Sequence, residues 1–158
     1  YGLDVRSVRY PGIISWKTPP GAGTTEYTIE MFYEGLKTGK YECFVRADTV
    51  LPMMYVDDAI KGTVDLMDAP SEKIKVRNSY NIAAISFEAQ DLEKEIKKYI
   101  PNIKVTYKPD KRQRIADSWP KSLDDLEARK DWGWKYEYDL PRMTKVIIKN
   151  LRIKFGIE

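Results

Sequence analysis

The sequence predicts a mixed α/β fold. Strand-like runs alternate along the chain with segments whose apolar residues recur at helical spacing, and that alternation is typical of α/β proteins. The 158 residues suffice for one domain with its own core, and 42% apolar with 32% charged residues is a globular composition. No apolar run approaches the roughly 18 residues of a membrane span, so we expect no transmembrane helix.

The first expected strand covers residues 5–15. Alternating residues lead into an apolar run, and Pro11-Gly12 marks the point where the strand opens into a loop. Taken alone, this segment would be one strand without parallel neighbours, although parallel strands are normally covered on both faces. The chain also begins almost directly in this strand, without an initiator Met. We therefore expect it to be part of a longer polypeptide or to pack against a second half.

A loop and a helix follow this strand. Residues 16–25 are rich in Pro and Gly, as loops are. Thr24 or Thr25 is expected to cap the helix behind the loop, and Gly39 suits the position just past the end of that helix. The apolar stripe of the helix consists of Ile29, Phe32, Tyr33 and Leu36.

Two short strands and a second helix come next. The strands are expected at residues 41–45 and 50–56. Asp57 is well placed to cap the helix, and Asp58 complements the helix dipole in the first turn. The helix is expected to stop before Pro70, and its apolar positions are Ile60, Val64 and Met67.

The remaining strands are expected at residues 79–85 and 103–107. Between them, Ser86 is expected to cap a helix that ends at Pro101 and carries an apolar stripe of Leu92, Ile96, Tyr99 and Ile100. Residues 108–138 are less regular and contain one short expected helix at 124–129.

The last expected helix begins after Asp139. This residue is predicted to be its N-cap, and Pro141 lies in the first turn, where proline is favoured. The apolar stripe is Leu140, Met143, Ile147 and Leu151.

Residue content restricts the chemistry that the chain can perform. With 27 Lys and Arg against 24 Asp and Glu, the net charge is only +3, and Asp110 dilutes the basic cluster of residues 108–114, so no nucleic-acid role is expected. Cys43 lies in a strand-like run and is expected to be a buried, inert thiol, which fits a reducing compartment. The absence of histidine excludes Ser-His-Asp and Cys-His catalysis and argues against a metal site.

The glycines do not form a phosphate-binding turn. Gly12, Gly21 and Gly23 match neither G-x-G-x-x-G nor its G-x-x-G-x-x-G variant. The chain therefore contains no start of a nucleotide-binding half.

Four segments resemble elements of the extended short-chain dehydrogenases. Arg9 to Ser15 resembles the strand behind the catalytic Tyr-x-x-x-Lys helix, and Leu51 to Ala59 resembles the (I/M)-Y-V-D-D element. Tyr80 to Ile82 is similar to the Y-N-(I/V) strand. Ala128 to Trp134 resembles the A-x-x-x-L-G-W helix end, with a tryptophan where leucine is commoner.

Three stretches narrow the resemblance to the L-threonine dehydrogenases of this superfamily. They are Tyr10 to Ser15 (YPGIIS), Gly21 to Tyr27 (GAGTTEY) and Ile115 to Pro120 (IADSWP). The resemblance, which spans nearly the whole chain, implies the C-terminal half of an NAD-dependent α/β enzyme. That enzyme oxidises the 3-hydroxyl of L-threonine to give 2-amino-3-ketobutyrate, and a Tyr phenolate helped by a Lys takes the proton.

The resemblance also assigns site residues. Pro11, Gly12 and Ile13 are expected to contact the nicotinamide, and an ordinary strand-to-loop turn is the alternative. Thr24 and Thr25 are expected to contact the amino-acid substrate near a helix N-terminus, and simple capping is the alternative. Trp119 is expected to pack under the site, and closing the site is the alternative.

Two other patterns suggest catalysis but have simpler interpretations. Tyr33 and Lys37 form a Y-x-x-x-K, but it follows the YPGIIS strand, whereas the family's pair precedes it. We expect a packing tyrosine, an exposed lysine and no catalytic residue in this chain. Asp57 and Asp58 are adjacent on a helix and point apart, so an acid–base dyad is not expected.

The resemblance predicts a division of the chain. Residues 1–15 are expected to be a late strand of an NAD-binding Rossmann domain. Residues 16–158 are expected to belong mainly to the substrate-binding domain, with about 41–70 returning to the Rossmann part. Expected partners are L-threonine, the missing N-terminal half and a second copy in a homodimer, in the cytoplasm. A sugar-nucleotide epimerase or dehydratase and a non-catalytic interaction fragment are the alternatives.

Overall fold

The computed structural model describes residues 2–157 and confirms a mixed α/β fold. Strands and helices alternate over most of the chain, and the last third is helical except for β7. The strands are β1 (Val8–Arg9), β2 (Gly12–Ile14), β3 (Lys40–Cys43), β4 (Val50–Tyr55), β5 (Tyr80–Asn81), β6 (Ile85–Glu88) and β7 (Lys104–Tyr107). The helices are α1 (Tyr27–Thr38), α2 (Val56–Asp68), α3 (Ala89–Lys97), α4 (Arg112–Ser118), α5 (Leu126–Trp132) and α6 (Leu140–Phe155), with a 3₁₀ turn at Ser71–Lys73.

The first strand region divides into β1 and β2, and each part pairs within the chain. β1 runs parallel to β5, with Val8 opposite Tyr80. β2 runs parallel to β4, with Gly12 opposite Met53. The expectation that residues 5–15 lack parallel neighbours is therefore wrong. Both strands nevertheless lie at a sheet edge, because each has a neighbour on one side only.

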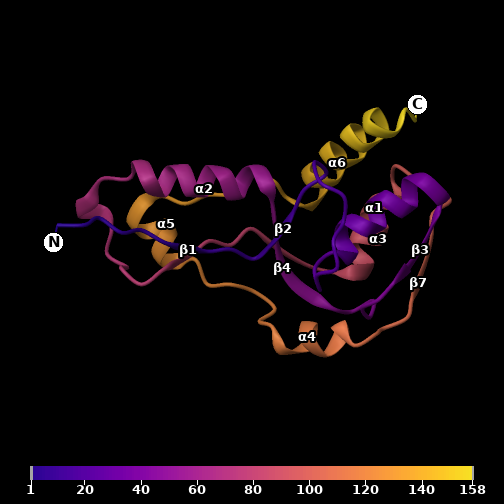
Figure 1. Ribbon diagram of the computed structural model, residues 1–158, viewed down its shortest axis with the longest axis horizontal. Coiled ribbons are helices and arrows are strands. Elements are labelled where there is room, and N and C mark those ends of the chain that lie inside the picture. The colour runs from indigo at the N-terminus through magenta and orange to yellow at the C-terminus, as the bar shows by residue number, and fades with distance from the viewer. Residues whose placement is uncertain (1, 158) are drawn as a thin grey trace.

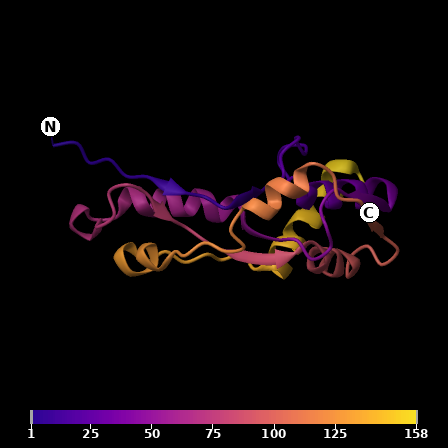
Figure 2. The same cartoon turned by 90° about the horizontal axis from the view of Figure 1, so that it is seen from below.

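The other strands complete three small sheets. β4 lies between β2 and β6 and pairs antiparallel with β6, whereas β3 pairs parallel with β7. Figure 1 shows β2 and β4 in the middle of the molecule, between a group containing α2 and α5 and a group containing α1, α3 and α6. The view in Figure 2 shows that the whole arrangement is elongated.

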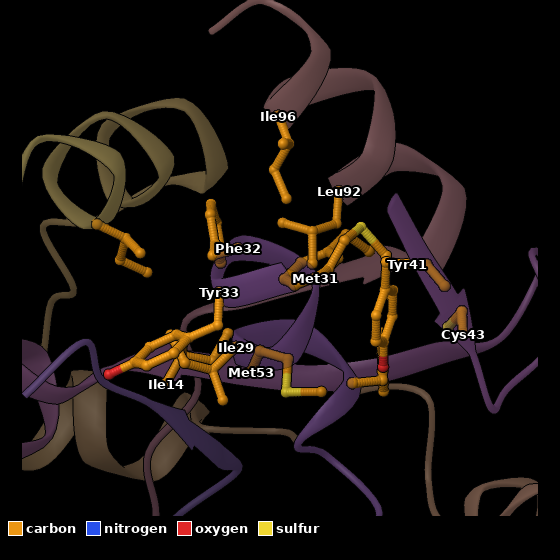
Figure 3. Close-up of a cluster of buried hydrophobic side chains, with 14 of the residues drawn as sticks. Ile14, Ile29, Met31, Phe32, Tyr33, Tyr41, Cys43, Met53, Leu92 and Ile96 are labelled. Atoms are coloured by element: carbon orange, nitrogen blue, oxygen red, sulfur yellow. The ribbon is translucent and has the colours of Figure 1, made fainter. Parts of the chain in front are cut away.

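Two hydrophobic clusters correspond to these two groups. The larger one packs α1, α3 and α6 against the strands, and Phe32, Met53 and Leu92 are fully buried in it (Figure 3). The smaller one lies among α2, α5 and β5 and includes Leu66 and Trp134. The stripe predicted for the last helix is largely confirmed, because three of its four residues, Met143, Ile147 and Leu151, have no exposed surface.

The start of α1 differs from the prediction. Glu26 is the N-cap residue, and no side chain caps the helix, so the prediction that Thr24 or Thr25 does so is wrong. Instead, the two threonines form a turn in which the carbonyl of Thr25 accepts hydrogen bonds from the amide and the hydroxyl of Thr28. The Thr25 carbonyl thus accepts the amide hydrogen bond that a threonine hydroxyl was expected to accept. The end of the helix at Gly39, with φ 70°, is as predicted.

The start of α2 also differs. Tyr55 is its N-cap, so the prediction that Asp57 caps this helix is wrong, and Asp57 lies in the first turn instead. Asp58 lies in the first turn as expected. The apolar residues that predict this helix face away from the core: Ile60 is 53% exposed, Val64 48% and Met67 68%.

Strand pairing overrides the predicted cap of α3. Ser86 lies inside β6 opposite Pro52, so the prediction that it caps the helix is wrong. Glu88 caps α3 instead, in a reciprocal capping box with Asp91. For α6 the prediction is confirmed, since the Asp139 carboxylate accepts a hydrogen bond from the amide of Arg142 at 2.8 Å. Within residues 2–157, no helix is long and apolar enough to cross a membrane.

Candidate functional site

An open depression of about 650 Å³ lies where the chain leaves β1 and enters β2. The carboxyl end of a parallel strand is where α/β proteins commonly bind ligands. Three separate segments line it: residues 9–13, residues 25–26 before α1, and residues after α4, together with Pro52 of β4.

The depression brings together residues that the sequence assigned to two different ligands. Pro11, Gly12 and Ile13 form one wall, and Thr25 lies on the same surface. Ile13 is 44% exposed, so a large part of its side chain is free to contact a ligand. Thr24 is 8% exposed and does not line the depression.

Gly12 permits the close approach of these segments. A Cβ atom at this position would lie 2.6 Å from the Sδ atom of Met53 and 2.8 Å from the Cγ2 atom of Thr25. Both distances are shorter than non-bonded carbon contacts allow. The absence of a side chain therefore lets the loop before α1 rest directly on β2.

Within residues 2–157, the hydroxyl of Thr25 forms no hydrogen bond with another protein group. The Thr25 carbonyl is used by Thr28, as described above. Since Thr25 lines the depression, its hydroxyl is available there to a ligand.

Trp119 lies on the rim of the depression and is 42% exposed. The expectation that it packs under the site stays a prediction. The preceding helix α4 is held by Gln113, whose side-chain oxygen accepts hydrogen bonds from the Arg46 amide at 2.7 Å and the Thr49 hydroxyl at 3.2 Å. The Arg46 guanidinium adds a two-pronged contact with Asp117 at 2.7 and 3.1 Å.

Several lining residues were not predicted. Pro52 enters the wall because β4 pairs with β2, and Pro120 and Leu123 enter it behind α4, which lies in the segment without a regular pattern. Arg9 and Glu26 are the charged groups of the lining. Pro52 and Pro120 lie in stretches that carry the family resemblance, whereas Leu123 lies in none of them.

Tyr33 and Lys37 lie outside the lining of the depression and make structural contacts. Tyr33 is 4% exposed, and its hydroxyl donates to the carbonyls of Trp16 and Thr18 at 3.1 and 3.2 Å. The exposed Lys37 lies over the rings of Tyr33 and Phe155. The prediction of a packing tyrosine beside an exposed lysine is confirmed.

Asp57 and Asp58 hold different parts of the chain. Asp58 is 1% exposed, and its two oxygens accept hydrogen bonds from the amides of Glu137 and Tyr138 at 2.8 and 3.0 Å. Burial raises the pKa of the Asp58 carboxyl above its ordinary value. Asp57 lies 3.9 Å from the Lys17 ammonium and 3.4 Å from the Tyr138 hydroxyl. Each carboxylate has its own partners, and neither lines the depression.

Cys43 is buried with no exposed surface, as predicted, and burial raises the pKa of its thiol to about 11. Such a thiol is inert at neutral pH. Over residues 2–157, no three or more His, Cys, Asp or Glu side chains gather where they could hold a metal ion.

Known proteins resemble this chain strongly. No family model matches it. A Bos taurus protein named L-threonine 3-dehydrogenase, mitochondrial, is 50% identical over 149 residues, which are 94% of this chain and 40% of that protein. A Staphylococcus haemolyticus protein named an uncharacterized epimerase/dehydratase is 44% identical over 98% of this chain and 49% of its own length.

A solved structure agrees with the sequence comparison. A monomeric L-threonine 3-dehydrogenase from a metagenome is 51% identical and superimposes with a TM-score of 0.93, over 97% of this chain and 49% of that one. The chain thus spans about half the length of the relatives that it matches. By sequence and by fold, it is a relative of the L-threonine 3-dehydrogenases and matches a C-terminal portion of their short-chain dehydrogenase fold.

Proposed function

We propose that this chain supplies the nicotinamide-side strand end and the threonine-covering loop of an NAD-dependent L-threonine 3-dehydrogenase. One observation carries the proposal: Gly12 and Thr25, assigned to cofactor and substrate respectively, touch each other in one depression. A dehydrogenase needs this proximity, because the hydride donor and acceptor must meet.

The wall formed by residues 11–13 suits a nicotinamide. Pro11 and Ile13 present apolar surface to a flat ring, and Gly12 keeps the backbone accessible from the depression. The volume of about 650 Å³ lies in the usual range of small-molecule sites. When bound, NAD⁺ accepts the hydride from the carbon that carries the threonine hydroxyl.

Thr25 is the residue to which we assign the first contact with threonine. Its hydroxyl is an uncommitted donor in the lining, and the N-terminus of α1, which begins two residues later, favours an anion such as the substrate carboxylate. We assign Thr24 a weaker part, because it is nearly buried outside the lining. Trp119, half exposed on the rim, shields the ligands from water.

Proton transfer is assigned to residues outside this chain. The carboxyls and the tyrosine discussed above are committed to structural contacts, and the family resemblance places the catalytic Tyr-x-x-x-Lys before β1. The chain itself binds and orients the reactants. The missing N-terminal half would then pack on the open edges of β1 and β2 and on the exposed side of α2, where Ile60, Val64 and Met67 are uncovered.

We propose the same division of the chain as before. Residues 1–15 and about 41–70 are assigned to a Rossmann domain, and the open edges of β1 and β2 and the exposed face of α2 support this assignment. Residues 16–158 otherwise form the substrate-binding part. We further propose a homodimer in the cytoplasm; a solved relative is described as monomeric and the bovine relative as mitochondrial, so sedimentation and cell fractionation are the tests.

The full-length protein that contains this chain tests the proposal directly. Purified protein is mixed with NAD⁺ and L-threonine, NADH is followed by absorbance, and the aminoketone product is identified by mass spectrometry. We expect threonine-dependent NADH formation. Its absence, in protein that is folded and binds NAD⁺, would overturn the proposal.

A sugar-nucleotide epimerase or dehydratase is the second candidate, because relatives 41–44% identical are named uncharacterized epimerase/dehydratases. The same protein is therefore incubated with UDP-hexoses. Conversion of a UDP-hexose without threonine oxidation would favour this candidate. A non-catalytic fragment would show neither activity, even when the full-length protein is used.

A further inference from the structure

The start of the glycine-rich loop is clamped from two helices. The hydroxyl of Tyr33 on α1 donates to the carbonyls of Trp16 and Thr18. The ammonium of Lys154, near the end of α6, donates to the Tyr33 hydroxyl at 3.0 Å and approaches the carbonyls of Trp16 and Lys17 at 3.4 and 3.2 Å. Residues 16–18 therefore gain their backbone contacts from segments far away in the sequence.

The packing of the Tyr33 ring holds its hydroxyl beside residues 16–18. Its ring belongs to the larger hydrophobic cluster and packs edge-on against Phe155, with the ring centroids 5.2 Å apart. Figure 3 shows the ring beside Ile14 and Ile29, with its hydroxyl pointing out of the cluster. The buried ring fixes the hydroxyl, and the hydroxyl fixes the loop.

The clamp sets the direction of the residues that follow. Pro19 and Pro20 come directly after Thr18, and proline fixes its own φ and restricts the residue before it. Because Pro19 and Pro20 have little backbone freedom, the orientation of the Thr18 peptide restricts the position of Gly21. The far end of the loop is tied separately, where the Gly21 amide donates to the Glu26 carboxylate at 2.9 Å.

We infer that Tyr33, assisted by Lys154, is a positioning residue that holds the loop of residues 19–25 in place for binding of the amino-acid substrate. This inference rests on the proposed function. It gives the Tyr33 hydroxyl a role without any contact with the reacting atoms. Loss of the clamp weakens threonine binding, whereas the nicotinamide wall at residues 11–13 belongs to a different segment and keeps its shape.

The test uses the full-length protein with Tyr33→Phe, which keeps the packed ring and removes only the hydroxyl. We expect the KM for L-threonine to rise about tenfold, with kcat and the KM for NAD⁺ changed less than about twofold. Lys154→Met should act in the same direction but more weakly, because Lys154 lies at the surface. Lys154→Arg, which retains the donors, should restore the wild-type KM.

Lys37→Met is the matched control, because it removes a neighbouring cation that lies 5.4 Å from the same ring but has no bond to the loop. Its KM should equal that of the wild type. Trypsin cleavage after Lys17, measured by mass spectrometry, gives a second readout that needs no activity, and the Tyr33→Phe protein should be cut several times faster at that bond.

The outcomes separate the two proposals. If the wild-type protein does not oxidise threonine, the proposed function fails while the cleavage assay still tests the clamp. If Tyr33→Phe leaves both the KM for threonine and the cleavage rate unchanged, the clamp has no positioning role. If Tyr33→Phe unfolds, Lys154→Met decides by the same two measurements.

Discussion

The side chain of Thr25 rests on the bare Cα of Gly12. The contact is so close that a Cβ on Gly12 would come within 2.8 Å of the Thr25 methyl carbon. Because the two residues belong to the proposed substrate and cofactor sides, a larger side chain at Gly12 must displace Thr25. This coupling gives the first two predictions.

Replacing Gly12 with alanine should disturb both sides of the site. The new Cβ would also meet the Sδ atom of Met53 at 2.6 Å, and Met53 is fully buried. We expect a loss of about 1–3 kcal/mol in the free energy of unfolding, typical of overpacking, with higher KM values for both NAD⁺ and threonine. Gly21→Ala is the stability control, since its nearest neighbour would be 3.9 Å away. Equal melting temperatures for both variants would contradict the predicted clash.

Two substitutions at Thr25 separate its hydroxyl from its methyl group. Thr25→Val keeps the shape that rests on Gly12 and loses the hydroxyl, so the KM for threonine should rise about tenfold with an unchanged melting temperature. Thr25→Ser keeps the hydroxyl and should retain most of the substrate affinity. Thr38→Val, at the other end of α1, is the control for loss of a threonine hydroxyl. A normal KM in Thr25→Val would remove Thr25 from the substrate site.

Replacing Asp58 with asparagine should destabilise the protein by about 1–3 kcal/mol. The two carboxylate oxygens accept hydrogen bonds from the backbone amides of Glu137 and Tyr138. In asparagine, the side-chain NH₂ group would face one of these backbone N–H groups, and two donors cannot bond each other. Asp57→Asn is the adjacent control and should change stability by less than about 0.5 kcal/mol, since the Asp57 side chain is 44% exposed and its contacts are long. Urea unfolding measures both effects.

Asp58 also predicts a pH dependence of stability. Burial raises the pKa of its carboxyl in the folded state above the unfolded value, so the native state holds this proton more tightly. The contribution of Asp58 to stability should therefore decline as the pH rises from the ordinary pKa of an aspartate through the raised one. The free energy of unfolding, measured across this pH range, should fall with pH in the wild type and fall less steeply in Asp58→Asn. Equal slopes in the two proteins would refute the predicted pH dependence.

Cys43 should resist alkylation in the folded protein. The thiol has no exposed surface, and its pKa of about 11 leaves little thiolate at pH 8. Iodoacetamide labelling followed by mass spectrometry should be slow at pH 8 and rapid in denaturant. Fast labelling under native conditions would show that the β3 region opens readily.

Prediction from sequence succeeded where the decisive contacts are local. Asp139 caps α6 because the bonded amide is three residues away, and Gly39 ends α1 because glycine tolerates a positive φ. It failed where distant pairing competes. Ser86 is an adequate N-cap, but it is held in β6 by pairing with β4, so the helix starts later.

The site was only partly predictable for the same reason. The wall of residues 11–13 and the part played by Thr25 were reached through motif resemblance, whereas Leu123 carries no local signal. The helical spacing of Ile60, Val64 and Met67 predicts an apolar stripe correctly, but spacing does not tell whether that stripe meets a core or a surface.

The sequence by itself determined the α/β class, the positions of most strands and helices, the family resemblance and the inert character of Cys43. These properties depend on residue type and on spacing within a few residues. Only the tertiary structure decided that Thr25 rests on Gly12, that Trp119 lies on the rim of the depression, and that Tyr33 clamps the loop at Thr18. Each of these depends on contacts between segments that strand pairing and core packing bring together, and no local pattern encodes such contacts.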